Sequence, residues 1–468
     1  MFRATIGSVK FILGKIQRKR KEVGGFRNLF LHTAFALTLT SGLSYALGLL
    51  RDKSFAYTFG ASSELDIYNA AFAIPDLFLA LLVTGTLSAA FVPIFSNLDE
   101  HNRQKGILYT NQILSFGLLI LGAVAVLFGL FLPHLVDFIV PGFDAEQKAQ
   151  YVTVTRLMLI SPLLFAISNT FGNVLISIKA FFWYGMAPVL YNVGIIIGVF
   201  VFVPHFGLLG LVIGTILGAF LHLGVRIPSL IRYGYRPQFV FIYNQEIRET
   251  VWLLIPKTVQ MGMWQLMLWW FVRLATELEE GSVTIYSFAR NFQSLPVSLV
   301  GIAMALAAFA NLSHVAANKD YREFKQLILG KSLIIMGYTT LAAIGLALIS
   351  HPLIGLLLGG GKFDAQAVAA TASLLMVYTI AVPLESVMHL LARAHYALKN
   401  TLRPSSIHVI TIVLTMVISA YFLDKIGLYA IPVSFAAGLL VQVLLLGVSL
   451  RQLILKLGSN EGVYGVKH

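Results

Sequence analysis

The sequence contains no cysteine among its 468 residues and few charged residues. The absence of cysteine excludes disulfides, thiolate metal sites, iron–sulfur clusters and cysteine nucleophiles. Charged residues make up 12% of the chain, whereas soluble globular proteins carry roughly a quarter. With 57% hydrophobic residues and a mean hydropathy of +0.81, the chain has more apolar residues than a soluble core needs.

Long apolar stretches recur along the chain from Leu31 to Leu455. A helix of about 20 apolar residues crosses the hydrocarbon core of a bilayer, where every backbone amide must be paired within the protein. These stretches are too long and too uniformly apolar for the alternating strands of a membrane barrel. The sequence therefore predicts an all-α polytopic membrane protein with about 12 transmembrane helices.

The charges are unevenly distributed along the chain. A net charge of +13 would fit nucleic-acid binding, but in a membrane protein cytoplasmic loops facing anionic lipid explain it better. Placing the N-terminus in the cytoplasm puts most lysines and arginines on that side and the acidic segments 137–146 and 277–280 outside. We therefore expect a multi-pass protein of the bacterial cytoplasmic (inner) membrane with both termini cytoplasmic. Membrane lipids, and no nucleic acid, are the expected partners.

Residues 1–30 are basic and carry apolar residues at helical spacing, namely Phe2, Ile6, Val9, Leu13 and Ile16. This pattern predicts an amphipathic helix on the membrane surface, and a solvated cytoplasmic tail is the alternative. A cleavable signal peptide is disfavoured because the basic run follows the apolar one and no small-residue cleavage site is present.

The two halves of the sequence contain an internal repeat. Ile67-Tyr68 recurs as Ile285-Tyr286 and Lys179 as Lys399, so the copies lie about 220 residues apart. An even number of helices between the copies gives both halves the same orientation, as in alternating-access transporters with a central cavity. We expect a basic N-terminal segment (1–30), an N-terminal six-helix lobe (31–232), a cytoplasmic linker (233–248), a C-terminal six-helix lobe (249–455) and a cytoplasmic tail (456–468).

Motifs for catalysis are missing from the sequence. No HExxH, GxSxG or phosphate-loop motif occurs, and the glycines 359–361 lack the Lys-Ser/Thr pair of a phosphate loop. We interpret these glycines as a flexible turn in an outer loop. A sodium site needs several oxygen ligands, including a carboxylate, whereas the eleventh span offers only Ser, Thr and His408. We expect no enzymatic activity, no cofactor and no metal site.

Several motifs, taken in order, resemble one transporter family. They are LGLLRDKSFAYTFGASSELDIYNAAFAIPDL followed by GTLSAAFVPIFS (47–96), APVLYNVGIIIG (187–198), GSVTIYSFARNFQSLPVSLVGIA (281–303) and LLARAHYALKNTLRP (390–404). The chain resembles the MurJ/MviN lipid II flippases of the multidrug/oligosaccharidyl-lipid/polysaccharide exporter superfamily. The resemblance implies two six-helix lobes around a V-shaped cavity and export of lipid II, the undecaprenyl-pyrophosphate-linked peptidoglycan precursor. It further implies a role in cell-wall biogenesis and cell shape, and cell-wall glycosyltransferases as partners. Many members add two C-terminal helices, which we expect to be absent here.

Arginines inside the spans are the candidates for binding a lipid pyrophosphate. Its headgroup carries about two negative charges, and the planar fork of arginine suits phosphate. Arg290 occupies the position of the family's cavity arginine in the eighth span, and Arg51 and Asp52 match the family's Arg-Asp pair in the first. The alternatives are an Arg290 that reaches the membrane interface and a structural ion pair at Arg51 and Asp52. Because sequence neighbours point to different helix faces, we expect Arg51 and Asp52 to need other partners.

Arg273 is a further candidate for substrate binding, near the outer end of the seventh span. Glu277 follows it at i+4, so a local ion pair with an arginine at the interface is the favoured interpretation. In the second span, Asp76 follows Pro75, where a proline break frees backbone groups that a polar side chain can satisfy. We therefore expect a capping or hinge role for Asp76 and Pro75.

Glu385, His389 and Arg393 follow one another at intervals of four residues and therefore share one face of the tenth span. A buried carboxylate beside a histidine and an arginine is suited to moving a proton or sensing an ion. The alternative is a polar seam that packs helices together, in which Arg393 has a structural role.

The sequence departs from the family where further cations are expected. The first span has Tyr45 at the position of a family arginine, and the second has Leu79-Ala80 in place of an Arg-Arg pair. Two other functions therefore stay open. One is a drug or polysaccharide exporter of the same superfamily, favoured by the lost arginines and by Trp269 and Trp270. The other is a transport-inactive scaffold that recruits cell-wall synthesis enzymes.

Overall fold

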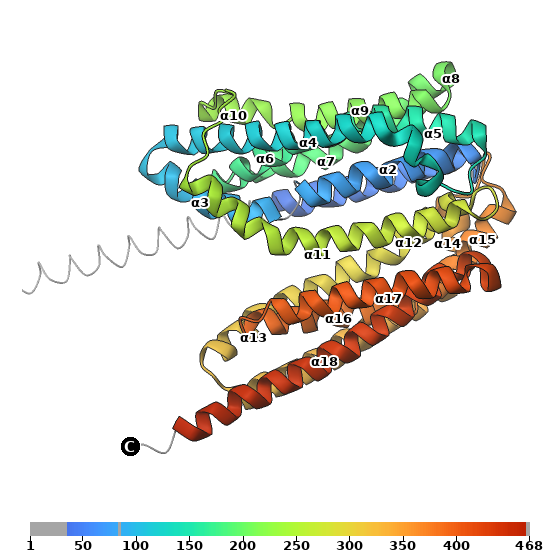
Figure 1. Cartoon of the computed structure of the whole chain (residues 1–468). Coiled ribbons are helices and arrows are strands. Elements are labelled where there is room, and N and C mark those ends of the chain that lie inside the picture. Colours follow the sequence, from blue (N-terminus) through green and yellow to red (C-terminus); the bar gives the residue numbers. More distant parts are fainter. Residues whose placement is uncertain (1–34, 83–85, 465–468) are drawn as a thin grey trace, which may run out of the picture.

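The computed structural model describes residues 35–82 and 86–464, which fold almost entirely into helices (Figure 1). The first half contains a helix over residues 35–59, α2 (Ser63–Leu82), α3 (Thr86–His101), α4 (Arg103–Ile139), α5 (Ala145–Met158), α6 (Ile160–Ser177), α7 (Phe181–Ile197), the π-helix η1 (Gly198–Phe202), α8 (Val203–Phe206), α9 (Leu208–Gly224) and α10 (Ile227–Tyr233). The second half contains α11 (Gln245–Thr276), α12 (Ser282–Pro296), the π-helix η2 (Val297–Ile302), α13 (Ala303–Ala317), α14 (Tyr321–Leu357), α15 (Ala365–Tyr378), α16 (Ala381–Ala397), α17 (Leu402–Ile426), η3 (Gly427–Tyr429) and α18 (Ala430–Tyr464).

The all-α polytopic membrane fold is confirmed, whereas the number of spans stays a prediction. Among the described residues, seven helical segments are long and apolar enough to cross a membrane, or eight if the bent pair α15 and α16 counts as one. One of the seven, Leu402–Leu457, contains α17 and α18, which pack against each other. The predicted amphipathic segment 1–30 lies outside the described residues. The predicted tail begins within α18, which continues to Tyr464.

The internal repeat reappears in the backbone. Lys179 and Lys399 both have positive φ angles, 62° and 58°, in tight turns that follow α6 and α16. Gly207 and Gly427 end their helices with nearly the same dihedral angles, φ 55° and ψ −135° against φ 56° and ψ −138°. A positive φ suits glycine and is unusual for lysine, so its recurrence at matched positions marks two copies of one chain path.

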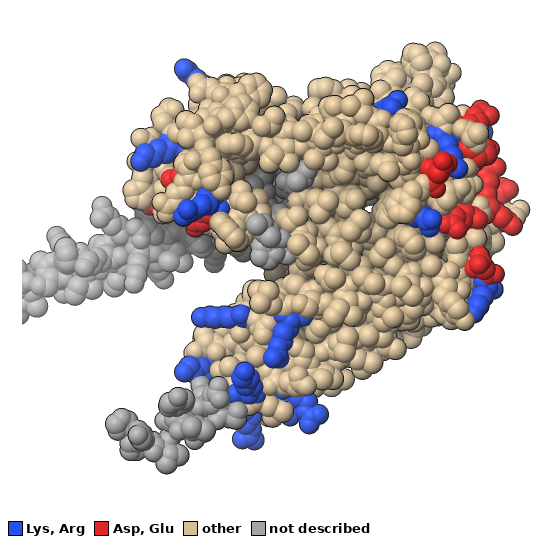
Figure 2. All heavy atoms as spheres, in the orientation of Figure 1, with Lys and Arg blue, Asp and Glu red and all other residues tan. Residues whose placement is uncertain are grey.

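The elements form two bodies with a hollow between them (Figures 1 and 2). Helices from the first half lie together in the upper body, and α12 to α18 form the lower one, in which α12 packs on α15. α11 lies between the bodies and packs on α2, α3 and α17. Figure 2 shows the hollow open at the end where lysines and arginines gather, while most of the acidic residues in view lie at the opposite, closed end.

Glycines bring α7 and α9 into backbone contact in the first half. A Cβ placed on Gly214 of α9 would lie 2.3 Å from the Cα of Gly198, which begins η1. Helices in membranes lack a hydrophobic force between them, so close packing of small residues supplies much of their association. At this crossing neither glycine can carry a side chain without moving the helices apart.

We therefore predict that Gly214→Leu destabilises the protein by about 1–3 kcal/mol, the usual cost of overpacking. Thermal unfolding in detergent measures the change. Gly224→Leu is the matched control on α9, because a Cβ there meets nothing within 4 Å. Equal melting temperatures for the two variants would contradict the role of the glycine contact.

Candidate functional site

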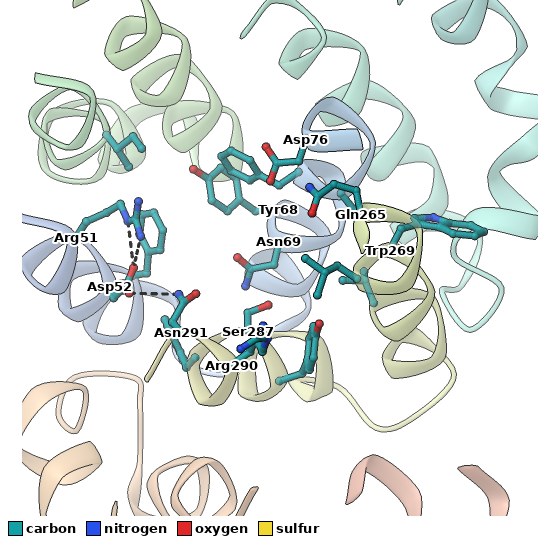
Figure 3. Close-up of a pocket in the computed structure, with 18 of the residues that line it drawn as sticks. Arg51, Asp52, Tyr68, Asn69, Asp76, Gln265, Trp269, Ser287, Arg290 and Asn291 are labelled. Atoms are coloured by element: carbon teal, nitrogen blue, oxygen red, sulfur yellow. Dashed lines mark hydrogen bonds and ion pairs between the residues drawn. The ribbon is translucent and has the colours of Figure 1, made fainter. Parts of the chain in front are cut away.

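The candidate site is a cavity of about 390 Å³ between the two bodies (Figure 3). Its polar wall comes from the helix over residues 35–59, from α2 and from α12, and α7 and α11 complete it. The residues with a polar group that line it are Arg51, Asp52, Tyr68, Asn69, Asp76, Tyr191, Gln265, Trp269, Tyr286, Ser287, Arg290 and Asn291. Arg51 and Arg290, predicted from different halves of the chain, therefore face one space.

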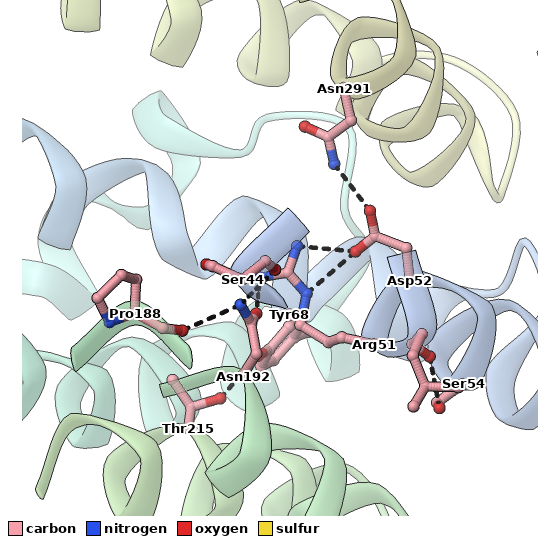
Figure 4. A network of polar contacts seen from close by, with 10 residues as sticks. Ser44, Arg51, Asp52, Ser54, Tyr68, Pro188, Asn192, Thr215 and Asn291 are labelled. Atoms are coloured by element: carbon pink, nitrogen blue, oxygen red, sulfur yellow. Dashed lines mark hydrogen bonds and ion pairs between the residues drawn. The ribbon is translucent and has the colours of Figure 1, made fainter. Parts of the chain in front are cut away.

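Arg51 and Asp52 form an ion pair with each other although they are sequence neighbours, and each also has the further partner that was expected (Figure 4). The Arg51 guanidinium donates to Asp52 Oδ1 from Nε at 3.0 Å and from Nη2 at 2.8 Å. Its long side chain reaches around the helix to its neighbour, which spacing along the helix alone does not show. Arg51 Nη1 also donates to Asn192 of α7 at 3.1 Å, and Asn291 of α12 donates to Asp52 Oδ2 at 3.4 Å. The pair thus connects the first half of the chain with the second.

Arg290 pairs with Glu385 across the lower body. Its Nη2 lies 3.3 Å from Glu385 Oε1, it also donates to Gln293, and Gln293 donates to Glu385 at 3.0 Å. The guanidinium carbon lies 5.0 Å from the ring centre of Phe435, which adds a cation–π contact. Because these groups hold Arg290 at the cavity wall, the structure does not place it at the membrane interface.

Glu385 is buried, but its hydrogen-bond partners lie on α12 and not on its own helix. The predicted partner Arg393 instead donates to the backbone carbonyl of His389 at 3.1 Å. The neighbouring helix therefore supplies the ion pair of Glu385. Coupling through Glu385, His389 and Arg393 stays a prediction.

The structure does not bring Arg273 to the cavity. Arg273 forms the expected i,i+4 pair with Glu277 at 2.9 Å and donates to the carbonyl of Phe138 at 3.0 Å.

Asp76 does line the cavity, although sequence reasoning assigned it to a cap or hinge. α2 continues through Pro75 to Leu82, and Asp76 makes no hydrogen bond with the residues that the structure describes.

Sequence reasoning missed the amides and hydroxyls that line the same wall. Asn69, Gln265, Ser287 and Asn291 all face the cavity. An uncharged polar residue within an apolar span was the available signal, but such residues also pack helices together. Trp269 lines the cavity, whereas Trp270 turns away and donates to Ser419 of α17.

A second cavity of about 460 Å³ adjoins the first and shares Arg51, Asp52 and Asn291 with it. Most of its remaining lining is apolar and comes from the helix over 35–59 and from α12 and η2. Tyr45 and Leu299 line it and are 50% and 63% exposed, respectively. Together the two cavities form one continuous space. Its polar part contains both arginines, and its mostly apolar part is open at the surface near Tyr45 and Leu299.

Contacts between the two halves close the cavity at the acidic end. Asp66 of α2 accepts hydrogen bonds from the backbone amides of Gly281 and Thr284, both at 2.7 Å, at the start of α12. A carboxylate at a helix N-terminus satisfies amides that have no partner within the helix and is favoured by the helix dipole.

The glycines 359–361 belong to the same closure, although sequence reasoning interpreted them as a flexible turn. The backbone amide of Lys362 donates to the carbonyl of Tyr57 at 3.0 Å, and the side chain of Lys53 donates to the carbonyl of Gly359. A Cβ on Gly361, where φ is +60°, would lie 2.3 Å from the Tyr57 carbonyl oxygen. The turn is therefore docked against the helix over residues 35–59, and glycine permits the close approach.

Comparison with known proteins agrees with this geometry. The model of the family "Lipid II flippase MurJ" matches residues 55–463. The lipid II flippase MurJ of Burkholderia cenocepacia is 27% identical over 440 residues, covering 91% of this chain and 84% of that protein. The probable lipid II flippase MurJ of Thermotoga maritima is 28% identical over 435 residues, covering 92% and 88%.

Solved structures show the same fold. A lipid II flippase MurJ in an inward closed conformation has a TM-score of 0.78 at 23% identity and covers 91% of this chain and 90% of its own. An inward-facing multidrug resistance transporter of the MATE family has a TM-score of 0.72 at 13% identity, covering 88% and 96%. The family suggested by the motifs is thus confirmed, and the chain belongs to the lipid II flippase MurJ family.

Proposed function

We propose that this chain is an alternating-access flippase that moves lipid II, a polyprenyl-pyrophosphate-linked glycan, across the bacterial cytoplasmic membrane. The observation that carries the proposal is the pair of adjoining cavities, one polar with two arginines and one mostly apolar. An amphiphile with an anionic headgroup and a long hydrocarbon chain has these two requirements. Transport without catalysis is consistent with family membership.

Binding of the headgroup requires an exchange of counter-ions. The cavity is lined by two arginines and two aspartates, so its formal charges balance among the described residues. Arg51 is already paired with Asp52, and Arg290 with Glu385. A pyrophosphate, with about two negative charges, would take both guanidiniums away from these carboxylates and connect the two halves.

The charge distribution supports an orientation with the open end in the cytoplasm. Lysines and arginines gather at the open end of the hollow and acidic residues at the closed end (Figure 2), and cytoplasmic loops carry the excess of basic residues. We infer that both termini are cytoplasmic and that the cavity here faces inward. The lobes 31–232 and 249–455 would move against each other, with residues 233–248 as their linker.

Two other functions stand as alternatives. The balanced charge of the cavity and the aromatic Trp269 also suit an exporter of apolar drugs or polysaccharides. A transport-inactive scaffold would instead act through loops that bind cell-wall glycosyltransferases. Loss of function on neutralising the cavity arginines separates a flippase from both.

We predict that the double variant Arg290→Gln/Glu385→Gln fails to replace the flippase of a host depleted of its own. The two amides keep hydrogen bonds at the site, so the fold survives while the cation is lost. Glu385→Gln alone keeps the cation but removes its counter-ion, so we expect it to be less stable and still to rescue growth once its amount in the membrane is matched. Growth after depletion, with the amount of protein in the membrane matched by immunoblot, measures the effect.

Arg273→Gln is the matched control for Arg290, because Arg273 is outside the cavity and should be dispensable. Full rescue by the double variant would reject Arg290 as a headgroup contact. Failure of rescue by the unmodified chain would favour the exporter or the scaffold.

We predict that locking the closed end stops transport. Ser63 and Glu280 are in contact there, since the Ser63 amide donates to Glu280 Oε1 at 2.7 Å. Because the natural chain has no cysteine, Ser63→Cys/Glu280→Cys gives one defined pair for a short, reducible thiol crosslinker. Crosslinking should abolish rescue and reduction should restore it, whereas each single cysteine should be unaffected. Unchanged growth in the crosslinked state would argue against alternating access.

We predict the orientation from thiol accessibility. A cysteine at Glu280, at the acidic end, should react with a membrane-impermeant maleimide in intact spheroplasts. A cysteine at Arg322, which is exposed in the first turn of α14, should react only after permeabilisation. The reverse pattern would place the hollow and both termini outside.

A further inference from the structure

A separate apolar pocket lies outside the two cavities described above. It has a volume of about 360 Å³ and lies between α4, α6 and the first half of α11. It shares no lining residue with the cavities that contain Arg51. The residues that line it are Leu81, Ile113, Leu114, Phe116, Gly117, Leu118, Ile120, Ala166, Thr170, Ile247, Thr250, Val251, Leu254, Thr258 and Val259.

The chemistry of the lining suits hydrocarbon and not water. Thr170 and Thr250 donate their hydroxyl hydrogens to carbonyls of their own helices, at 2.9 and 2.7 Å. A water molecule needs two to four polar partners, and apolar cavities without them stay dry. The open space is also seen at Gly117, where a Cβ would meet nothing within 4 Å.

Residues 235–244, which we call the strap, lie beside the pocket without lining it. Three buried polar residues of α4 hold the strap by hydrogen bonds to its backbone. Asn111 donates to the carbonyl of Arg236 at 3.0 Å, and Gln112 donates to the carbonyl of Ile242 at 3.1 Å. The hydroxyl of Ser115 accepts from the amide of Val240 at 2.8 Å. Phe241 and Tyr243 of the strap contact Phe116, a lining residue, edge to face.

The strap and its surroundings have the composition of a membrane interface. Phe239, Tyr243 and the nearby Trp252 are 81%, 62% and 70% exposed. Aromatic residues concentrate at the level of lipid headgroups. Exposed Arg248 and Glu249 give this level charges of both signs.

The pocket extends from this level into the region of the lipid chains. Its lining on α11 runs from Ile247 to Val259, about 18 Å of helix and over half of the roughly 30 Å hydrocarbon thickness. Ile120 and Val259, which line it, are 51% and 54% exposed, so the pocket is open at the surface of these helices.

We propose that this pocket binds one acyl chain of a membrane phospholipid, with the headgroup at the strap. This choice of ligand rests on the proposed function, in which the hydrocarbon chain of the transported lipid occupies the apolar cavity beside Arg51. A bound acyl chain would fill the space between α11 and the upper body and so support the helix that lies between the two bodies. Because the charges near the strap are mixed, headgroup charge should matter little.

The test uses the purified full chain in detergent and a phospholipid with a photoactivatable diazirine on its acyl chain. Labelling should be saturable and should map by peptide mass spectrometry to residues 113–120 and 247–259. Gly117→Phe places a ring in the pocket and should reduce labelling about tenfold, the effect of losing the burial of roughly two methylene groups. Probes with phosphatidylglycerol and phosphatidylcholine headgroups should label alike.

Gly122→Phe is the matched control, because Gly122 lies on α4 outside the pocket and its Cβ would also meet nothing within 4 Å. It should label like the natural chain. Val259→Trp fills the pocket from α11 and replaces Gly117→Phe if that variant does not fold, as judged by its melting temperature without lipid.

Three outcomes would overturn the proposal. Labelling could fail to saturate, or pocket-filling variants that fold could label normally. Undecaprenyl phosphate could also displace the probe at a lower concentration than unlabelled phospholipid, which would assign the pocket to the transported lipid. None of these results depends on whether the chain transports lipid II.

Discussion

The arrangement of the cavity depends on one constraint, that an arginine buried within a membrane protein needs polar partners. Arg290 would be costly in the lower body without Glu385, and Arg51 depends in the same way on Asp52. Each pair draws further donors toward it, Gln293 in one case and Asn192 and Asn291 in the other. The positions of the helix over 35–59 and of α7, α12 and α16 are therefore linked through two ion pairs.

The closed end solves a different problem, which is to join two halves that must also separate. Its contacts are made by helix ends and turns: Asp66 accepts from the first amides of α12, and the turn at Gly361 docks on Tyr57. Such contacts satisfy polar groups that water can also satisfy once the halves part. Asp66 is buried while this end is closed, and parting of the halves would expose it and the first amides of α12 to water, which can replace the lost hydrogen bonds.

The helical fold, the repeat and the family could be predicted from sequence because each leaves a periodic or ordered signal. Arg51 and Arg290 could be singled out because an arginine within a span needs a reason to be there, and both line one cavity, while their binding of substrate stays a prediction. Partners across helices could not be predicted. The pairing of Glu385 with Arg290 depends on how α12 packs on α16, and the glycines 359–361 looked flexible because nothing in their sequence marks the helix on which they dock.

The balance of charges in the cavity sets what its two arginines must do in the proposed transport. With Arg51 and Arg290 facing Asp52 and Asp76, the cavity has no surplus of positive charge among the described residues. An anionic headgroup therefore gains little from long-range attraction and must compete with Asp52 and Glu385 at short range. Such competition makes binding inseparable from breaking the ion pairs that position the helices. A headgroup that displaces these carboxylates from the arginines would also loosen the contacts of Asp52 with Asn291 and of Glu385 with Gln293. Binding of the headgroup and rearrangement of the helices around the cavity would then occur together.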